Sequence, residues 1–457
     1  MAEKALHICL LTYRGNPQSG GQGIYTRLLS RELAAMGHRV DVWSGQPYPE
    51  LTDGVNLVEI PGLDLWNSDA LLRMLTLTEA RDPINRSEWL RSKLGEFAEP
   101  RSFCARVARR FERLNGSLDY DIVHDNQCLG AGLLDLRKRL PVVATIHHPI
   151  TKDYRFALES ARGLLNLKKN YGVRRWYSFL PMQFEVSRQL EQIFTVSRAS
   201  ADDLEHDYGI SRDRLRVVGN GINIEAFGPR PEITRRSDRL ITTLSADQPL
   251  KGFTFLLDAL AELRKTRPAL TLKVIGCSEP REVTLKQIRR LGLEAAVDFS
   301  GRVETEVIAR AYAESTVAVV ASLYEGFGFP AGEAMACEVP LVSTTGGALP
   351  EVVGESGKAG VLVEPGNAAA LARAIDEMLD APEQRRRAMG EAGRRRVLAQ
   401  FTWRRAAERT VDGYREAIEK HHGVPAMAQS TATVAPLRRT AGDELAPDTS
   451  GPAAEPC

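Results

Sequence analysis

The 457-residue sequence lacks three features, and each absence excludes a class of protein. It has almost no excess charge, because 60 Lys and Arg residues are balanced by 59 Asp and Glu residues, for a formal net charge of +1. A global electrostatic attraction to nucleic acid or to acidic substrates is therefore excluded. No run of about 18 apolar residues occurs, so a membrane-spanning helix is excluded and only surface attachment remains.

Cysteine is also scarce, and its spacing carries information. The six cysteines are scattered singly without a C-x-x-C pair, which argues against a zinc knuckle and against a disulfide framework. The amino-terminal apolar run at residues 6–11 is about half the length of a signal-peptide core. We therefore expect a cytoplasmic protein whose cysteines are mostly buried small side chains.

The length and the hydrophobic pattern predict two domains. The chain is too long for one ordinary domain, and 43% hydrophobic residues with 26% charged residues are typical of a soluble globular protein. Short apolar runs rich in β-branched residues alternate with segments of helical period, which is the pattern of βαβ units. Because this pattern occurs in two blocks, we predict an α/β fold of two Rossmann-like domains that face each other across a cleft.

Changes in composition along the chain predict the limits of these parts. We expect one domain at 1–200, a second at 201–400, a helix at 401–421 and a disordered tail at 422–457, which is rich in Ala, Pro, Thr and Ser. The expected strands are 6–11, 39–43, 122–124, 142–146 and 193–196 in the first block, 215–218 near the crossing, and 240–244, 270–275, 297–299, 317–320 and 341–343 in the second block.

Residues 325–333 form the most informative of the segments that follow an expected strand. Pro330 suits the first position of a helix, so Glu325 lies in the preceding loop and Glu333 in the first or second helical turn. Two carboxylates can then face one ligand. Glycines in the loop let backbone amides reach sugar hydroxyls or phosphate oxygens, and the positive end of the helix faces a leaving diphosphate. The alternative is that Glu333 only caps its own helix.

Three other strand ends carry candidate ligand contacts. The glycines of S-G-G-Q-G at 19–23 allow close backbone approach to an anion, although a tight turn is the alternative and the dinucleotide fingerprint is incomplete. Lys251 is a point charge suited to a phosphate, or else a solvated lysine. His147 can supply a hydrogen bond at neutral pH, and its neighbour His148 does not complete a metal site. Asp119-Tyr-Asp121 leads into the amino end of a strand, so we interpret it as a turn.

Together these segments resemble the retaining glycosyltransferases of family four, which have the GT-B fold. The resemblance extends to about residue 421. It rests on G-G-Q-G-I-Y at 20–25, G-H-R-V-D-V at 37–42, D-I-V-H at 121–124, V-V-A-T-I-H at 142–147, F-T-V-S at 194–197, N-G-I at 220–222, P-L-K-G at 249–252, E-x7-E at 325–333 and G-G-A-L-P-E at 346–351.

The resemblance implies a nucleotide diphosphate sugar that is bound mainly by the second domain. Glu333 would hold the ribose hydroxyls, Glu325 would contact the transferred sugar near the reacting carbon, and Lys251 would neutralise the diphosphate. Backbone amides that would meet sugar and phosphate belong to Phe327, Gly328 and Phe329.

The first domain completes the implied site, and one cation is missing from it. Gly20 and Gly21 would approach the diphosphate, and His147 would face the sugar and the acceptor. Relatives commonly carry an Arg five residues before the phosphate lysine, where this chain has Ala246. Its loss removes charge-assisted hydrogen bonds of about 1.5–3 kcal/mol. Arg302 is the candidate replacement, since it follows an expected strand; the alternative is weaker donor binding.

The predicted reaction is transfer of a hexosyl group from a UDP- or GDP-sugar to an acceptor hydroxyl with retention of configuration, without metal or cofactor. Glu325, His147 and Lys251 are the catalytic candidates. A nucleotide-sugar epimerase, a phosphorylase and a non-catalytic nucleotide-sugar sensor are the alternatives on the same fold. The acceptor is a carbohydrate, a lipid-linked sugar or a small metabolite. Basic and aromatic residues between 152 and 184 suit either contact with the inner face of an anionic membrane or a solvated acceptor-side wall.

Overall fold

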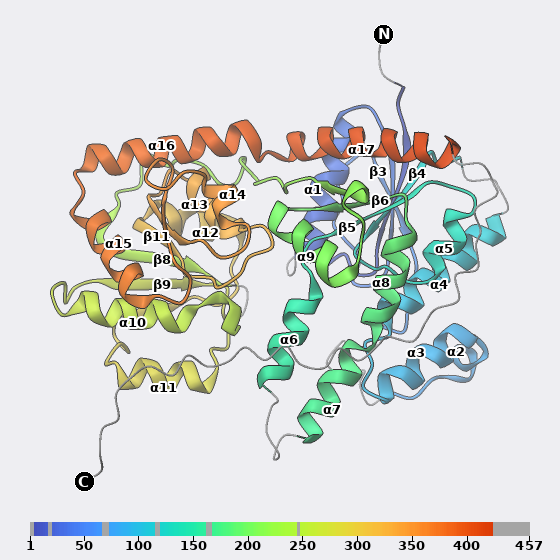
Figure 1. The fold of residues 1–457 in the computed structure, drawn as a ribbon, viewed down its shortest axis with the longest axis horizontal. Coiled ribbons are helices and arrows are strands. Elements are labelled where there is room, and N and C mark those ends of the chain that lie inside the picture. The colour runs from blue at the N-terminus through green and yellow to red at the C-terminus, as the bar shows by residue number, and fades with distance from the viewer. Residues whose placement is uncertain are drawn as a thin grey trace.

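The computed structural model describes residues 4–16, 21–65, 73–114, 119–160, 167–244 and 247–423. These residues form two parallel sheets flanked by helices (Figure 1), which confirms the predicted pair of Rossmann-like domains. The first sheet has the strands β1 (His7–Thr12), β2 (Arg39–Ser44), β3 (Val55–Glu59), β4 (Ile122–Asn126), β5 (Val142–Ile146), β6 (Gln192–Thr195) and β7 (Leu215–Val217). The second has β8 (Arg236–Thr243), β9 (Thr271–Ile275), β10 (Val297–Phe299), β11 (Ser315–Val320), β12 (Leu341–Thr344) and β13 (Val361–Val363).

The helices connect these strands in the order of parallel crossovers. In the first part of the chain they are α1 (Gly21–Ala35), α2 (Leu77–Arg81), α3 (Pro83–Lys93), α4 (Glu99–Leu114), α5 (Gly132–Arg137), α6 (Ile150–Ser160), α7 (Leu167–Trp176), α8 (Leu180–Gln189) and α9 (Arg198–Tyr208). In the second they are α10 (Phe253–Arg264), α11 (Glu282–Arg290), α12 (Thr305–Ala313), α13 (Phe329–Ala336), α14 (Leu349–Val353), α15 (Ala368–Asp380), α16 (Glu383–Gln400) and α17 (Trp403–Gly423). None of the helices in the described ranges is long and apolar enough to cross a membrane.

The order of the strands places one switch point in each sheet. The first sheet runs β3-β2-β1-β4-β5-β6-β7 and the second β10-β9-β8-β11-β12-β13. In each sheet the chain reverses direction of winding between two central neighbours, β1 and β4 in the first and β8 and β11 in the second. Ligands collect beyond the carboxyl ends of strands at such points, so the loops that follow these four strands are the expected site.

The strands that the sequence did not predict lie at sheet edges. Both β3 and β13 are edge strands, and their residues are only partly buried or exposed, so they lack the apolar runs of the central strands. The strand β8 begins at Arg236, before the expected start at 240, because its polar first residues still pair with β11.

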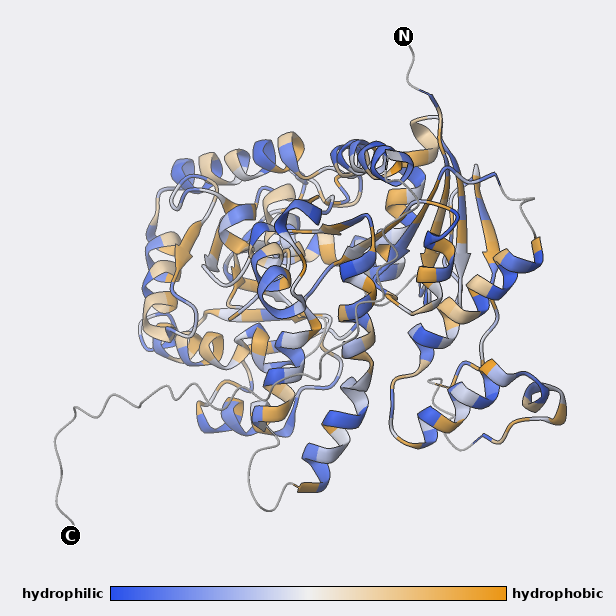
Figure 2. Cartoon of the chain, turned by 45° about the vertical axis from the view of Figure 1, so that its right-hand side comes forward, coloured by the Kyte–Doolittle hydropathy of each residue, from blue (hydrophilic) through white to orange (hydrophobic). Residues whose placement is uncertain are grey.

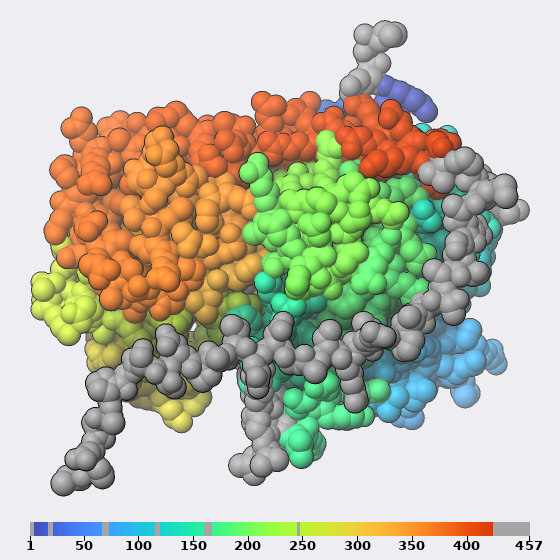
Figure 3. All heavy atoms as spheres, viewed as in Figure 1, coloured from blue at the N-terminus to red at the C-terminus, as the bar shows by residue number. Residues whose placement is uncertain are grey.

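The final two helices pass over both domains. The helix α16 packs against α13, and α17 packs against α1; they form a continuous band along one edge of the molecule (Figure 3). Trp403, Ala407 and Tyr414 of α17 share one buried cluster with Leu29 and Leu33 of α1. Figure 2 shows how polarity is distributed over the fold: hydrophobic residues are concentrated in the strands and hydrophilic residues on outward helix faces. The predicted tail lies outside the described residues beyond residue 423.

Candidate functional site

A cavity of about 340 Å³ lies where the two domains meet, within the size range of small-molecule sites. Its lining comes from both sheets and from the crossing segment between them. The lining residues are Gln22, Tyr25, Gln127, His147, His148, Asp153, Asn220, Gln248, Leu250, Lys251, Tyr324, Glu325, Gly326, Phe327, Gly328 and Phe329. The loops after β8 and β11 therefore converge on one space with residues that follow β4 and β5.

The Glu325 carboxylate and the Lys251 ammonium form an ion pair in this cavity. Glu325 Oε1 accepts hydrogen bonds from Lys251 Nζ at 2.8 Å and from Ser322 Oγ at 2.7 Å. Glu325 is only 8% exposed, and among the described residues both donors bind Oε1, which leaves Oε2 for another partner. Lys251 ends the short 3-10 turn after β8, so a carboxylate from one switch-point strand and a cation from its neighbour meet as a pair.

The glycine loop after Glu325 is packed too tightly for larger residues. A Cβ added at Gly326 would lie 2.7 Å from the backbone oxygen of His147 in the opposite domain. Gly328 has a φ of 105°, and a Cβ there would lie 2.9 Å from a methyl carbon of Leu349. Gly328 is also the N-cap of α13. Pro330 has no N–H and Ala331 N donates to Gly328 O, so the N–H of Phe329, a residue of the cavity lining, is the donor that this helix end offers to an anion.

Glu333 lies outside the cavity lining, one turn into α13. Its environment includes the hydroxyl of Tyr312, which also lies 3.1 Å from Thr243 Oγ1. Burial raises the pKa of Glu333 to about 8, so its carboxyl is protonated at neutral pH. A buried carboxyl of this kind ionises and accepts hydrogen bonds only when a ligand supplies donors in place of the water that burial removed.

This pKa predicts a pH-dependent affinity for nucleoside diphosphates. If Glu333 accepts ribose hydroxyls as a carboxylate, binding must release its proton, so affinity should rise as the pH increases from about 6 to about 8 and then level off. Stability of the empty protein should change in the opposite direction, because the folded state holds a proton that the unfolded state loses above its ordinary pKa. Calorimetric titration of wild type and Glu333→Gln across this range checks the prediction; an equal slope in the variant would contradict it.

His147 is held by residues that the sequence did not single out. Its Nε2 lies 2.7 Å from Asn126 Oδ1, and its backbone N–H donates to Gln127 Oε1 at 2.8 Å. Asn126 Nδ2 donates to Gln22 O and to Thr26 Oγ1, so its oxygen is the atom that faces His147. Burial lowers the pKa of His147 to about 4. The imidazole is therefore neutral, with the proton on Nε2 and with Nδ1 as an acceptor.

The turn that carries Asn126 and Gln127 is strained, and a hydrogen bond to the side chain of Asp125 stabilises it. Gln127 and Leu129 have positive φ values of 55° and 50°, which cost energy for residues with side chains. Asp125 Oδ2 accepts a hydrogen bond from Leu129 N at 2.9 Å, and this bond closes the turn. No signal in the sequence marks this turn, because its bonds to His147 join residues about 20 positions apart.

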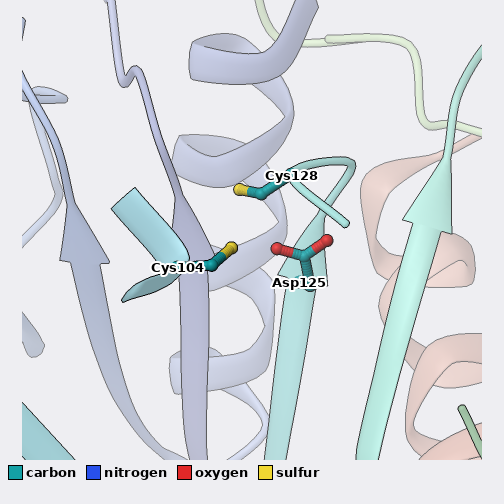
Figure 4. Close-up of side chains that lie close together, drawn as sticks. All are labelled: Cys104, Asp125 and Cys128. Carbon is teal, nitrogen blue, oxygen red and sulfur yellow. The ribbon is translucent and has the colours of Figure 1, made fainter. Parts of the chain in front are cut away.

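A small polar cluster lies behind the turn in the buried core. The ligand atoms of Cys104, Asp125 and Cys128 all lie within 4.8 Å of one another (Figure 4). Burial raises the pKa of Asp125 to about 6 and raises that of the Cys128 thiol well above its ordinary value. Cys104 lies in α4 and Asp125 in β4. Figure 4 shows Asp125 on its strand and Cys128 in the turn that follows, so the cluster joins these three elements.

The remaining predicted contacts are not all brought together. Gly21 begins α1, while Gly20 and Ala246 lie outside the described residues. Arg302 is exposed in the turn after β10, an edge strand, and it is absent from the described lining of the cavity. Its proposed contact with the diphosphate stays a prediction. Arg281 is another arginine of the second domain, and its guanidinium pairs with Asp247 through Nη2 and Oδ1 at 3.3 Å.

Two family models match consecutive parts of the chain. The model described as Glycosyltransferase Family 4 matches residues 19–226, and the model described as Glycosyl transferases group 1 matches residues 230–396. The boundary between the two matches falls in the segment between β7 and β8, where the chain leaves the first sheet.

Curated relatives and solved structures agree with these models. The chain is 43% identical to the MMP alpha-(1->4)-mannosyltransferase of Mycolicibacterium hassiacum, over 91% of this chain and 99% of that protein. It is 27% identical to the D-inositol 3-phosphate glycosyltransferase of Paenarthrobacter aurescens, over 92% and 98% of the two chains. The structures of sucrose-phosphate synthase from Thermosynechococcus elongatus (TM-score 0.67, 24% identity, 90% and 98% coverage) and of Anabaena HepE with UDP-glucose (TM-score 0.63, 18%, 89% and 99%) share the fold.

Proposed function

The chain belongs to glycosyltransferase family 4, and on that premise we propose that it transfers a mannosyl group from a nucleoside diphosphate mannose to the 4-hydroxyl of a sugar acceptor, with retention of the α configuration. The observation that carries the proposal is the Glu325–Lys251 pair in the interdomain cavity, joined to the 43% identity with an alpha-(1->4)-mannosyltransferase. The donor carries uracil or guanine as its base.

The reaction assigns a task to each group. The bond between the sugar C1 and the diphosphate oxygen breaks, and the acceptor oxygen forms a bond to C1 on the same face. Lys251 and the N-terminus of α13 stabilise the charge that develops on the diphosphate. The acceptor proton passes to an oxygen of the departing diphosphate. Glu325 and neutral His147 hold sugar hydroxyls from opposite sides, which positions C1 for this step.

A donor panel tests the proposal. Purified protein is incubated with UDP- and GDP-linked hexoses, with and without a mannoside acceptor, and the products are separated by mass. We expect consumption of a mannosyl donor that depends on the acceptor and a product heavier by one hexose. An epimerase would convert the donor without an acceptor, and a sensor would bind it without turnover; either result would overturn the proposal.

The helix α7 supports two interpretations that predict opposite results. Figure 1 shows α6 and α7 projecting from the same side of the first domain. Leu167 is 71% exposed and Tyr171 is 65% exposed, and basic side chains lie among them. A peripheral contact with an anionic membrane predicts flotation with anionic vesicles at low salt. A solvated acceptor-side wall predicts none.

Vesicle flotation with matched variants distinguishes these interpretations. If α7 contacts the membrane, Leu167→Ser with Tyr171→Ser should abolish flotation, because both apolar side chains leave water on binding. Leu398→Ser on α16, a position that is 41% exposed, is the matched control and should float as wild type does. Equal recovery of all three proteins in the pellet would support the solvated wall.

A further inference from the structure

We propose that Glu351 and Ser197 are positioning residues that fix the donor loop, residues 324–328, against the first domain. Neither residue lines the cavity, so neither is a ligand contact in the described site. The inference rests on the proposed role of the donor loop in sugar binding, and it concerns how that loop is held in place across the domain boundary.

A carboxylate of the second domain caps a helix of the first. The helix α9 begins at Arg198, and its first N–H groups have no partner within the helix. Arg198 N donates to Glu351 Oε2 and Ala199 N donates to Glu351 Oε1, both at 2.9 Å. Both carboxylate oxygens are thus used, and the positive end of the helix favours their negative charge.

The same end of α9 also binds the donor loop directly. The backbone oxygen of Gly326 accepts hydrogen bonds from Ser197 Oγ at 2.7 Å and from Ser200 Oγ at 3.3 Å. One turn later, Asp203 Oδ2 accepts from Tyr324 Oη at 2.6 Å. Two residues of the loop, on either side of Glu325, are therefore anchored to one helix of the opposite domain.

Glu351 is joined to Glu325 by a short and tightly packed path. Glu351 lies on α14, and the residue just before this helix, Ala348, donates its backbone N–H to the backbone oxygen of Glu325 at 2.9 Å. Gly347 has a φ of 61°, and a Cβ there would lie 2.4 Å from that same oxygen. A shift of Glu351 relative to α9 would therefore move the backbone of Glu325.

These contacts predict an effect on turnover rather than on folding or nucleotide binding. Water can hydrogen-bond the first N–H groups of α9 when the carboxylate is absent, so the helix should persist. The nucleoside diphosphate contacts proposed above belong to the second domain, so its affinity should be retained. The first domain supplies His147 and the proposed acceptor site. The alignment of Glu325 with both should be lost.

The test compares Glu351→Ala and Glu351→Gln with Glu355→Ala, an exposed neighbour that pairs only with Lys358 among the described residues. We expect Glu351→Ala to lower kcat by about 10- to 100-fold through misalignment, with an unchanged melting temperature and an unchanged Kd for the nucleoside diphosphate. Glu351→Gln, which keeps one acceptor oxygen, should fall between, and Glu355→Ala should match wild type.

Two further measurements test the proposal in other ways than the turnover of Glu351→Ala. Ser197→Gly removes the hydroxyl at little cost to the helix cap and should reproduce the loss of kcat if Glu351→Ala fails to fold. Small-angle X-ray scattering should show a larger radius of gyration for Glu351→Ala than for wild type, whichever donor the enzyme uses. Unchanged kcat in Glu351→Ala, or a loss of nucleotide affinity equal to the loss of kcat, would overturn the proposed positioning role. If wild type shows no turnover with mannosyl donors, that result counts only against the proposed reaction.

Discussion

Replacing Glu325 with glutamine should lower kcat by about 10²- to 10³-fold while the protein remains folded. The carboxylate accepts from both Lys251 Nζ and Ser322 Oγ through one oxygen. No hydrogen bond from the described part of the chain uses its other oxygen, which can accept from a sugar hydroxyl. The amide keeps the shape but presents an NH2 group in place of one oxygen and removes the charge that pairs with the lysine. Steady-state kinetics with saturating donor and acceptor measure the effect.

The control for this variant is a carboxylate outside the site. Glu306 on α12 forms an ion pair with Arg230, and its side chain is 67% exposed, so Glu306→Gln should retain wild-type turnover. Circular dichroism and melting temperature establish that both variants are folded. Turnover of Glu325→Gln within a factor of about two of wild type would remove Glu325 from the mechanism, because that change in kcat amounts to only about 0.4 kcal/mol of transition-state stabilisation.

Replacing Lys251 with methionine should weaken nucleoside diphosphate binding by about 10- to 100-fold, the equivalent of losing one charge-assisted hydrogen bond. Within the described lining of the cavity, Lys251 is the residue with a permanent positive charge, and its side chain is 21% exposed. Methionine keeps the length of the side chain without the charge. Because the lysine also pairs with Glu325, kcat should decrease as well.

Calorimetric titration with UDP and GDP measures this loss, and charge-keeping and distant variants serve as controls. Lys251→Arg should recover part of the affinity, since a guanidinium retains the charge but not the point geometry of an ammonium. Lys286→Met on α11, where the side chain is 71% exposed, should bind as wild type does. Undiminished affinity in Lys251→Met would show that the diphosphate is held by other groups.

The site residues that could be predicted from the sequence share one property, which is that each follows a buried central strand. Lys251 follows β8, Glu325 follows β11 and His147 follows β5, and apolar runs mark all three strands. Lys251 and Glu325 meet because β8 and β11 are neighbours and the carboxyl ends of parallel strands lie at the same edge of a sheet. His147 reaches the same cavity from the first sheet, across the domain boundary.

The residues that could not be predicted act through contacts between distant parts of the chain. Gln127 holds the backbone of His147 from a strained turn, and Glu351 caps a helix that lies some 150 positions earlier. Local sequence carries no signal for either contact. Arg302 follows an edge strand, which has the same local pattern as a central strand but lies away from the switch point, so its role stays a prediction.

The most direct test of the central claim is the anomeric configuration of the product. Purified enzyme is given an α-configured nucleoside diphosphate mannose and a mannoside acceptor, and the new linkage is assigned by NMR. If the Glu325–Lys251 site transfers the sugar with retention of anomeric configuration, the product carries an α-linked mannosyl group on the 4-hydroxyl of the acceptor. A β-linked product, or donor breakdown at the same rate without acceptor, would contradict the account.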